Sequence, residues 1–285
     1  MAERGMTENY IAAATQAHLN RRREKLVLID GAQGAANRQA QIREICASQL
    51  GPFPEHTPLK PRIIEQLSRE GYSIDMLTYE SMPGVVVTAN VYIPGGADAP
   101  YPTVLCVPAY TSQGKAHAEC QRLGQLLARR GIAALILDFP GQGERLEFYD
   151  STLRRSFTGR LMAAEQAHLG NLLLLTGKNL VNWMVWDAMC GLDALIELKQ
   201  AHPEKMGVIG CAGGAVVARL MTCMDPRICA AAIVAGHFDA EWAGGGDEDH
   251  VHFSALALGV TALDTLAAFA PKPLLIAQCS QDRFK

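Results

Sequence analysis

The sequence predicts an α/β fold built on a doubly wound, mostly parallel sheet. From about residue 100 onward, five short and wholly apolar runs alternate with segments of helical spacing. Strands that are apolar on both faces are typical of parallel sheets that helices cover on both sides. Before this series, two strand-like runs flank Met82-Pro83-Gly84, which is a turn signal. They predict an antiparallel hairpin at one edge of the sheet.

The composition is that of a globular protein and excludes several classes of partner. Of the 285 residues, 49% are hydrophobic and 19% are charged. The hydrophobic residues are numerous enough to fill a large core. The net charge is -3 and no long basic face occurs, so nucleic acid is not expected as a partner. No stretch of about 18 apolar residues occurs, so no membrane association is expected.

The cysteine pattern predicts free thiols. The sequence holds eight cysteines, mostly inside apolar runs, with neither C-x-x-C pairing nor the spacing of metal ligands. We therefore expect reduced thiols, a cytoplasmic location, and neither a metal nor a cofactor.

Residues 1–70 are expected to form a helical preface and a connector. Helical spacing extends from Asn9 to about Leu50, where Gly51 and Pro52 end it. Residues 52–62 contain four prolines and predict an extended connector. The core is expected to span residues 71–285 and to begin with the hairpin, whose strands are 73–81 and 85–94.

The core alternates strands and helices. Apolar strands are expected at 103–107, 133–139, 207–211, 229–236 and 273–279, and the helices between them at 117–131, 180–200, 213–224 and 261–269. A mostly helical insert at about 150–176 interrupts the series. We expect it to lie over the carboxyl edge of the sheet as a cap.

The most informative stretch is the turn Gly210-Cys211-Ala212-Gly213-Gly214, which follows an apolar strand and precedes a helix. A nucleophile elbow, G-x-S-x-G, has this form and displays its central serine on a strained backbone. Here the central residue is Ala212. Generic packing turns and phosphate loops also have glycines at such a turn, but no Gly-Lys-Ser/Thr follows and no G-x-G-x-x-G register fits.

Several motifs in the chain support the elbow. They are Phe53-Pro54-Glu55, Thr57-Pro58-Leu59-Lys60-Pro61, Glu80-Ser81-Met82-Pro83-Gly84, Asp138-Phe139-Pro140-Gly141-Gln142-Gly143-Glu144, Trp186-Asp187 and Asp225-Pro226-Arg227-Ile228. These motifs and the order in which they occur make the chain from about Tyr10 resemble the acetyl xylan esterase-like branch of the α/β-hydrolase superfamily.

The resemblance implies hydrolysis of carboxylic esters by a Ser, Asp, His triad and hence a small-molecule ester or acyl ligand. It places the nucleophile position at Ala212, the oxyanion amides at Gly213 and Tyr110, and the acid at Asp282. The histidine belongs downstream of Asp282, and the sequence ends at Lys285. Because alanine has no hydroxyl, we expect the chain as written to be nearly inert as a serine hydrolase.

Two residues near the elbow are candidates for lining a pocket. Cys211 is expected to be a packed thiol rather than a substitute nucleophile. His237 follows an apolar strand at the carboxyl edge, where ligands bind in open α/β sheets, although the neighbouring loop is an alternative partner for its ring.

Other polar groups are assigned structural roles. Residues 244–252, with three acids and two histidines, suggest a metal site, but a solvated loop is the favoured interpretation. Asp138 and Glu144-Arg145 are expected to brace loops rather than to act as an acid–base pair. Trp183 and Trp186 are expected to pack in the core or against the cap.

Two other functions stay open from the sequence. One is a pseudoenzyme that keeps the pocket and binds an acyl or carbonyl ligand or a partner protein; the other is a peptidase or lyase on the same scaffold. The resemblance implies a further strand and helix after Asp282, so without them we expect 273–279 to form an exposed edge of the sheet. Either the chain continues, or a partner such as a second copy covers this edge.

Overall fold

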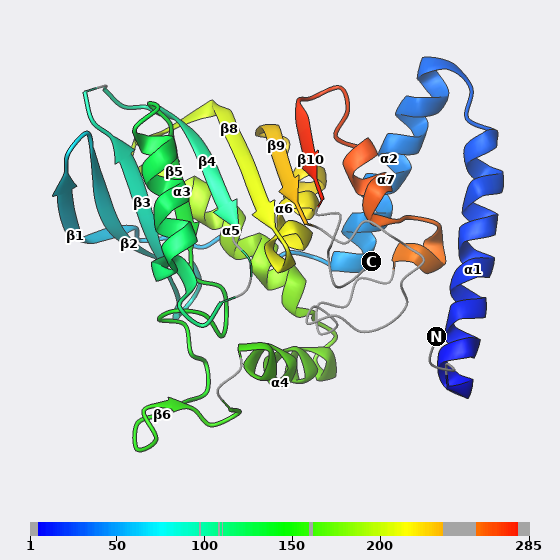
Figure 1. The fold of residues 1–285 in the computed structure, drawn as a ribbon, viewed down its shortest axis with the longest axis horizontal. Helices are drawn as coiled ribbons and strands as arrows, with labels where there is room; N and C mark the ends of the chain where they lie inside the picture. Colours follow the sequence, from blue (N-terminus) through cyan, green and yellow to red (C-terminus); the bar gives the residue numbers. More distant parts are fainter. Residues whose placement is uncertain are drawn as a thin grey trace.

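A mixed eight-stranded sheet forms the centre of the molecule, as the computed structural model shows (Figure 1). The structure describes residues 5–96, 98–107, 109, 111–159, 162–235 and 255–278. The strand order is β1-β2-β3-β5-β4-β8-β9-β10. The strands are β1 (Arg62–Arg69), β2 (Tyr72–Met82), β3 (Val85–Pro94), β4 (Tyr101–Val107), β5 (Ala133–Leu137), β8 (Ala201–Cys211), β9 (Ile228–Val234) and β10 (Leu274–Ala277).

The pairing confirms the predicted fold class. Strands β2 and β3 form the expected antiparallel hairpin, and β3 joins β5 in antiparallel fashion. The five apolar runs become β5, β4, β8, β9 and β10, which all pair in parallel. The consecutive parallel strands bring their carboxyl ends to one edge of the sheet, where ligands usually bind in such folds.

Strand β1 is an element that the sequence did not predict. It lies at 62–69, inside the region expected to be preface and connector, and pairs antiparallel with β2. Seven of its eight residues are exposed and one is half-buried. The strand therefore has no buried face, and its sequence, RIIEQLSR, lacks the alternation of apolar and polar residues that marks a half-buried strand. The sheet therefore begins earlier than residue 71.

Helices cover the two faces of the sheet unequally. Helices α5 (Leu180–Glu197) and α6 (Gly213–Met224) pack on one face and enclose the larger core, which includes Leu105, Leu135 and Val208. Helix α3 (Ala118–Ala128) packs on the other face, over β3 and β5, around Tyr92 and Ile136. Beyond α3, this second face of β8, β9 and β10 carries no helix among the described residues, so the expected two-sided cover is only partial there.

The N-terminal preface is a pair of helices, α1 (Met6–Val27) and α2 (Gly31–Leu50). Helix α2 packs against α6 and α7 (Ala262–Ala267) through its buried residues Ile42, Cys46 and Leu50. Helix α1 lies further out (Figure 1) and is held by Arg22, whose Nε lies 2.6 Å from Asp264 Oδ2. It also contacts the short 3₁₀ helix η2 (Ala255–Leu258).

The insert contains a small hairpin and a helix. Strands β6 (Tyr149–Asp150) and β7 (Arg155–Ser156) pair with each other, and α4 (Met162–Leu175) follows. Gln166 Nε2 of α4 donates to Pro140 O at 2.9 Å, in the loop after β5. Helix α4 thus lies past the carboxyl ends of the strands (Figure 1), in the position expected of a cap.

In the part of the chain that the structure describes, no helix combines the length and apolarity that crossing a bilayer requires.

Candidate active site

The turn between β8 and α6 has the backbone of a nucleophile elbow. Its central residue, Ala212, has φ 47° and ψ -121°, a conformation that an L-residue adopts only with strain. Two hydrogen bonds hold it there: Ala212 N donates to Val234 O at 2.9 Å, and Ala215 N donates to Ala212 O at 2.8 Å. The turn is therefore tied both to the end of β9 and to the first turn of α6.

Gly210 allows α6 to approach β8 closely. A Cβ placed on Gly210 would lie 2.4 Å from Ala218 Cβ and 2.7 Å from Gly214 O. Any side chain at this position would push the helix away from the strand. The first glycine of the motif is thus required by packing, whereas the strained backbone lies at the residue between the glycines.

The elbow lacks a nucleophilic side chain but keeps a backbone hydrogen-bond donor. Ala212 is half-buried and presents a methyl group, which supplies neither a nucleophile nor a cap for the helix. Gly213 is the first residue of α6, where backbone N–H groups have no partner within the helix and the helix dipole is positive. The N–H of Gly213 is therefore suited to stabilise a negatively charged oxygen at this turn.

A hollow of about 450 Å³ borders the elbow on the α3 side of the sheet. Its lining is mostly apolar and comes from β4, the segment after it, α3, β8 and β9: Val107, Ala109, Thr111, His117, Glu119, Cys120, Leu123, Ile209, Cys211 and Val234. Cys211 is half-buried in this wall, and burial raises the pKa of its thiol. At neutral pH it is a protonated thiol, in keeping with the packing role expected for it rather than with that of a nucleophile.

His117 is a residue of this hollow that the sequence did not single out. It precedes α3, and its Nδ1 accepts a hydrogen bond from Glu119 N at 3.4 Å. The only sequence signal was its place at the start of the helical segment 117–131.

A charge cluster centred on a buried carboxylate braces the loops that follow β4 and β5. Asp138 is fully buried and accepts hydrogen bonds from Lys115 N at 2.7 Å and from Thr88 Oγ1 at 2.8 Å. Lys115 Nζ forms ion pairs with both Asp138 and Glu144. Lys115 belongs to η1 (Gly114–Ala116), which follows β4, and Asp138 follows β5. The predicted bracing role of Asp138 is therefore confirmed.

Neighbouring residues are also structural. Arg145 forms an ion pair with Asp187 of α5, and both side chains are buried. Trp186 Nε1 donates to Ser81 O at 2.8 Å, and its ring stacks on Phe53 with centroids 5.7 Å apart. Trp183 packs against the main core. These contacts support the packing roles expected for the tryptophans.

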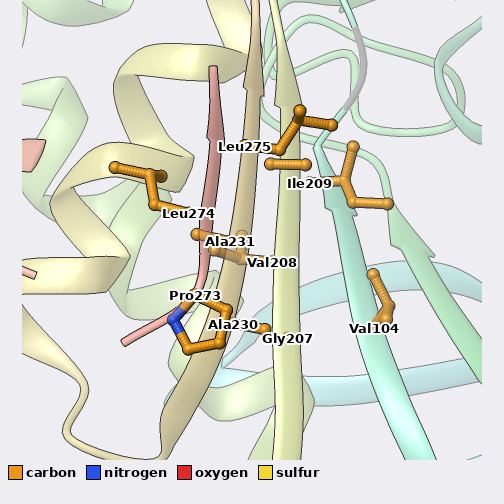
Figure 2. A pocket seen from close by; sticks show the side chains of 10 residues that line it. Val104, Gly207, Val208, Ile209, Ala230, Ala231, Pro273, Leu274 and Leu275 are labelled. Carbon is orange, nitrogen blue, oxygen red and sulfur yellow. The ribbon is translucent and has the colours of Figure 1, made fainter. Parts of the chain in front are cut away.

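A second hollow of about 400 Å³ opens on the uncovered part of the same sheet face. Figure 2 shows only apolar side chains and glycine around it, with Val104, Ile209 and Leu275 from three strands. Ile209 lines both hollows. Since no titratable group lines the second hollow, we assign no catalytic role to it.

The structure brings together only part of the site expected from the sequence. Ala212, Gly213 and Cys211 lie at one turn, whereas Tyr110, His237 and Asp282 fall outside the described residues, as does the loop 244–252. Among the residues that are described, no group of three or more His, Cys, Asp or Glu side chains is placed to hold a metal ion.

The sheet order and the elbow define the class of protein: an α/β hydrolase. A protein-family model described as the Abhydrolase family matches residues 31–231, so the chain belongs to this family. Among curated proteins, it is 22% identical over 200 residues to "Putative hydrolase YtaP" of Bacillus subtilis (strain 168). The match covers 67% of this chain and 62% of that protein, so the chain spans less than two thirds of its relative's length.

Solved structures share the fold. A "putative acetyl xylan esterase" from Bacteroides fragilis NCTC 9343 is 20% identical with a TM-score of 0.68, covering 86% of this chain and 68% of that one. Methylesterase BT1017 is 22% identical with a TM-score of 0.70 over 92% and 55% of the two chains. Acetyl Xylan Esterase 1 from Thermoanaerobacterium sp. JW/SL YS485 is 12% identical with a TM-score of 0.57 over 88% and 83%.

Proposed function

We propose that the chain has the scaffold of a carboxylic ester hydrolase of the acetyl xylan esterase-like kind and that Ala212 prevents its first chemical step. The observation that carries this proposal is the strained backbone at Ala212, φ 47° and ψ -121°, held at the start of α6. Strain of this kind costs about 1–3 kcal/mol and persists where the surrounding structure enforces it, most often at functional sites.

The proposed chemistry follows from what this turn would do with a serine. A hydroxyl at position 212 would attack the carbonyl carbon of an ester, and the N–H of Gly213 would stabilise the resulting oxyanion. The resemblance adds a second amide at Tyr110 and an acid at Asp282 that orients a histidine. With alanine in place, acylation has no nucleophile. A triad enzyme that lacks a member retains only about 10³- to 10⁴-fold over water.

The names of the structural relatives support an ester as the substrate class. They include acetyl xylan esterases and a methylesterase, which by name share the carboxylic ester bond. The relatives differ in the group attached to the ester. Because their sequence identity to this chain is low, the likeness supports a shared fold and not a shared substrate. We therefore propose a small ester or acyl compound as the ligand without naming its alcohol.

A second candidate function is ligand binding without turnover. The amide at the start of α6 and the hollow beside Cys211 are both present although the nucleophile is absent. A carbonyl or carboxylate oxygen has a donor at Gly213, and an apolar group has a wall formed by residues such as Leu123 and Ile209. On this view, the chain is a pseudoenzyme that holds an acyl ligand.

The test is Ala212→Ser made in the complete gene product, with p-nitrophenyl acetate as substrate. The variant should hydrolyse the ester at least about 10³-fold faster than the unaltered protein, because the nucleophile is restored at a preformed turn. Ala232→Ser is the matched control: it adds the same hydroxyl to a half-buried residue inside strand β9, outside the strained turn, and should stay inactive.

Two outcomes separate the candidates. If folded Ala212→Ser protein shows no more activity than Ala232→Ser, the esterase proposal is wrong. If the unaltered protein binds acetate or a p-nitrophenyl acyl amide without cleaving it, and Ala212→Ser still fails to turn over the ester, the pseudoenzyme is favoured.

A further inference from the structure

The hollow on the α3 side of the elbow has a helix on one side and the sheet on the other. Cys120 and Leu123, three residues apart on α3, face it from the helix. From the sheet, it is lined by Ile209 and Cys211, which share one face of β8 because side chains alternate along a strand. Val234 adds the neighbouring strand β9.

The strand register gives this hollow a direction. Cys211 pairs with Val234, and both line the hollow at the carboxyl edge, beside Ala212, whose N–H donates to Val234 O at 2.9 Å. Ile209 lies two residues back along β8, about 7 Å further from the edge. The hollow therefore begins next to the elbow and extends along β8 away from position 212.

The polar side chains of the lining lie at the end of the hollow nearest the elbow. Helix α3 connects the parallel strands β4 and β5, so it starts near the carboxyl edge and runs back along the sheet. Thr111 precedes this helix, and His117 and Glu119 lie at its start. Leu123 follows one turn later and, with Ile209, makes the deeper part apolar. A few polar groups at the mouth of an apolar interior are typical of small-molecule sites.

The size of the hollow exceeds what an acetyl group needs. Its volume is about 450 Å³, whereas a water molecule, similar in size to a methyl group, takes up about 30 Å³ of the liquid. An extended chain advances about 1.2 Å per bond, as the backbone does, so the distance of about 7 Å along β8 corresponds to about six bonds. An acetyl group has a single methyl beyond its carbonyl and would leave Leu123 and Ile209 without a partner.

We propose that this hollow binds the acyl chain of the ligand, and that this chain is a straight aliphatic one of about six to eight carbons rather than acetyl. The inference rests on the proposed function for the place of the carbonyl, at position 212 beside the N–H of Gly213. The chain then passes Cys211 and ends between Leu123 and Ile209. Each methylene buried there should strengthen binding about fourfold.

The first test uses the unaltered protein with octanoate and acetate as probes. Titration calorimetry should show octanoate binding at least about 10²-fold more tightly than acetate, because it buries six more methylenes. Octanoate should also slow the alkylation of Cys211 by N-ethylmaleimide, because Cys211 lines the hollow. The exposed thiol of Cys229 is the internal control and should react at the same rate with and without octanoate.

A pair of variants on α3 tests the position of the chain. Leu123→Trp fills the apolar end of the hollow and should remove the preference for octanoate over acetate. Leu126→Trp is the matched control: it makes the same change on the same helix at a side chain that is 45% exposed, and the preference should persist.

Ala212→Ser separates this inference from the proposed function. If both are correct, the variant cleaves p-nitrophenyl octanoate with a higher kcat/KM than p-nitrophenyl acetate. If it cleaves the acetate ester and not the octanoate ester, the acyl-chain inference is wrong and the proposed function stands. If octanoate binds and protects Cys211 but the variant cleaves neither ester, the proposed function is wrong and the binding site stands.

The proposal fails if octanoate binds no more tightly than acetate, or if it leaves the alkylation of Cys211 unchanged. It also fails if a dimer forms with rising protein concentration and protects Cys211 without octanoate, since the hollow is then an interface between copies. These results come from the unaltered protein, so they stand even if Leu123→Trp does not fold.

Discussion

The two ends of helix α6 differ in what they offer chemically. At its start, the backbone is strained and the amide of Gly213 is available, yet the side chain at position 212 is a methyl group. At its end, Cys223 carries a thiol, yet this thiol is buried and donates a hydrogen bond to Thr265 O at 3.4 Å, away from the elbow. The geometry that displays a nucleophile and the chemistry of a nucleophile are therefore separate properties of one helix.

The largest effect is expected from filling the space at the start of α6. Gly210→Ala would place a Cβ 2.4 Å from Ala218 Cβ and should destabilise the protein by about 3 kcal/mol through overpacking. Urea unfolding measures this loss.

Two variants sharpen that prediction. Gly207→Ala on the same strand places its Cβ no closer than 3.3 Å to Ala230 O and should cost clearly less. Adding Ala218→Gly to Gly210→Ala should recover part of the loss. If Gly207→Ala and Gly210→Ala cost the same, the close packing of α6 on β8 is not what requires the glycine.

A smaller effect of opposite sign is expected at the strained residue. Ala212→Gly removes the Cβ from a backbone with positive φ and should stabilise the fold by about 1 kcal/mol, even after the greater freedom of glycine in the unfolded chain is counted. The same change at Ala215, inside α6 and fully buried, should destabilise the protein. A loss of stability with Ala212→Gly would contradict the strain, and chemical denaturation of the three proteins decides between the two.

The smallest effect is expected near the other end of α6, at Asp264 of α7. Burial opposes its ionisation, but hydrogen bonds from Arg22 and Thr261 outweigh burial and hold the pKa of this carboxyl below its ordinary value of 3.8. Such a group contributes stability that is complete above about pH 4 and is lost as the pH falls through its lowered folded-state pKa. Each unit of lowering is worth about 1.4 kcal/mol.

The measurement is the free energy of unfolding between pH 6 and pH 3. The unaltered protein should lose more stability over this range than Asp264→Asn, whose side chain does not titrate. Parallel curves for the two proteins would show that the ion pair of Asp264 with Arg22 does not stabilise the ionised form.

The sequence predicted the parts of the fold that local patterns encode. The parallel strands β4, β5, β8, β9 and β10 came from apolar runs, and the elbow came from the glycines around Ala212. Strand β1 escaped because its residues are almost all exposed, so no alternating pattern marks it. An edge strand that is held by backbone hydrogen bonds rather than by burial leaves little trace in a sequence.

Contacts between distant residues could not be predicted in the same way. Lys115 meets Asp138 only because β4 and β5 are neighbours in the sheet, and Arg22 meets Asp264 only because α1 and α2 contact η2 and α7. Gly114 and Gly143 carry a hint, since a Cβ on either would collide with the Asp138 carboxyl. From the sequence alone, however, a glycine does not reveal which side chain lies close to its Cα in the folded protein.

The central claim is that position 212 displays its side chain as a nucleophile beside the amides of α6. The most direct measurement is the alkylation of Ala212→Cys by iodoacetamide across a range of pH, because it needs no histidine. A thiol at a helix N-terminus should titrate below the usual pKa of about 8.5 and react faster than the half-buried thiol of Cys211, whose pKa is raised by burial. An unreactive thiol at position 212 in folded protein, or one that titrates at or above the usual value, would contradict the account.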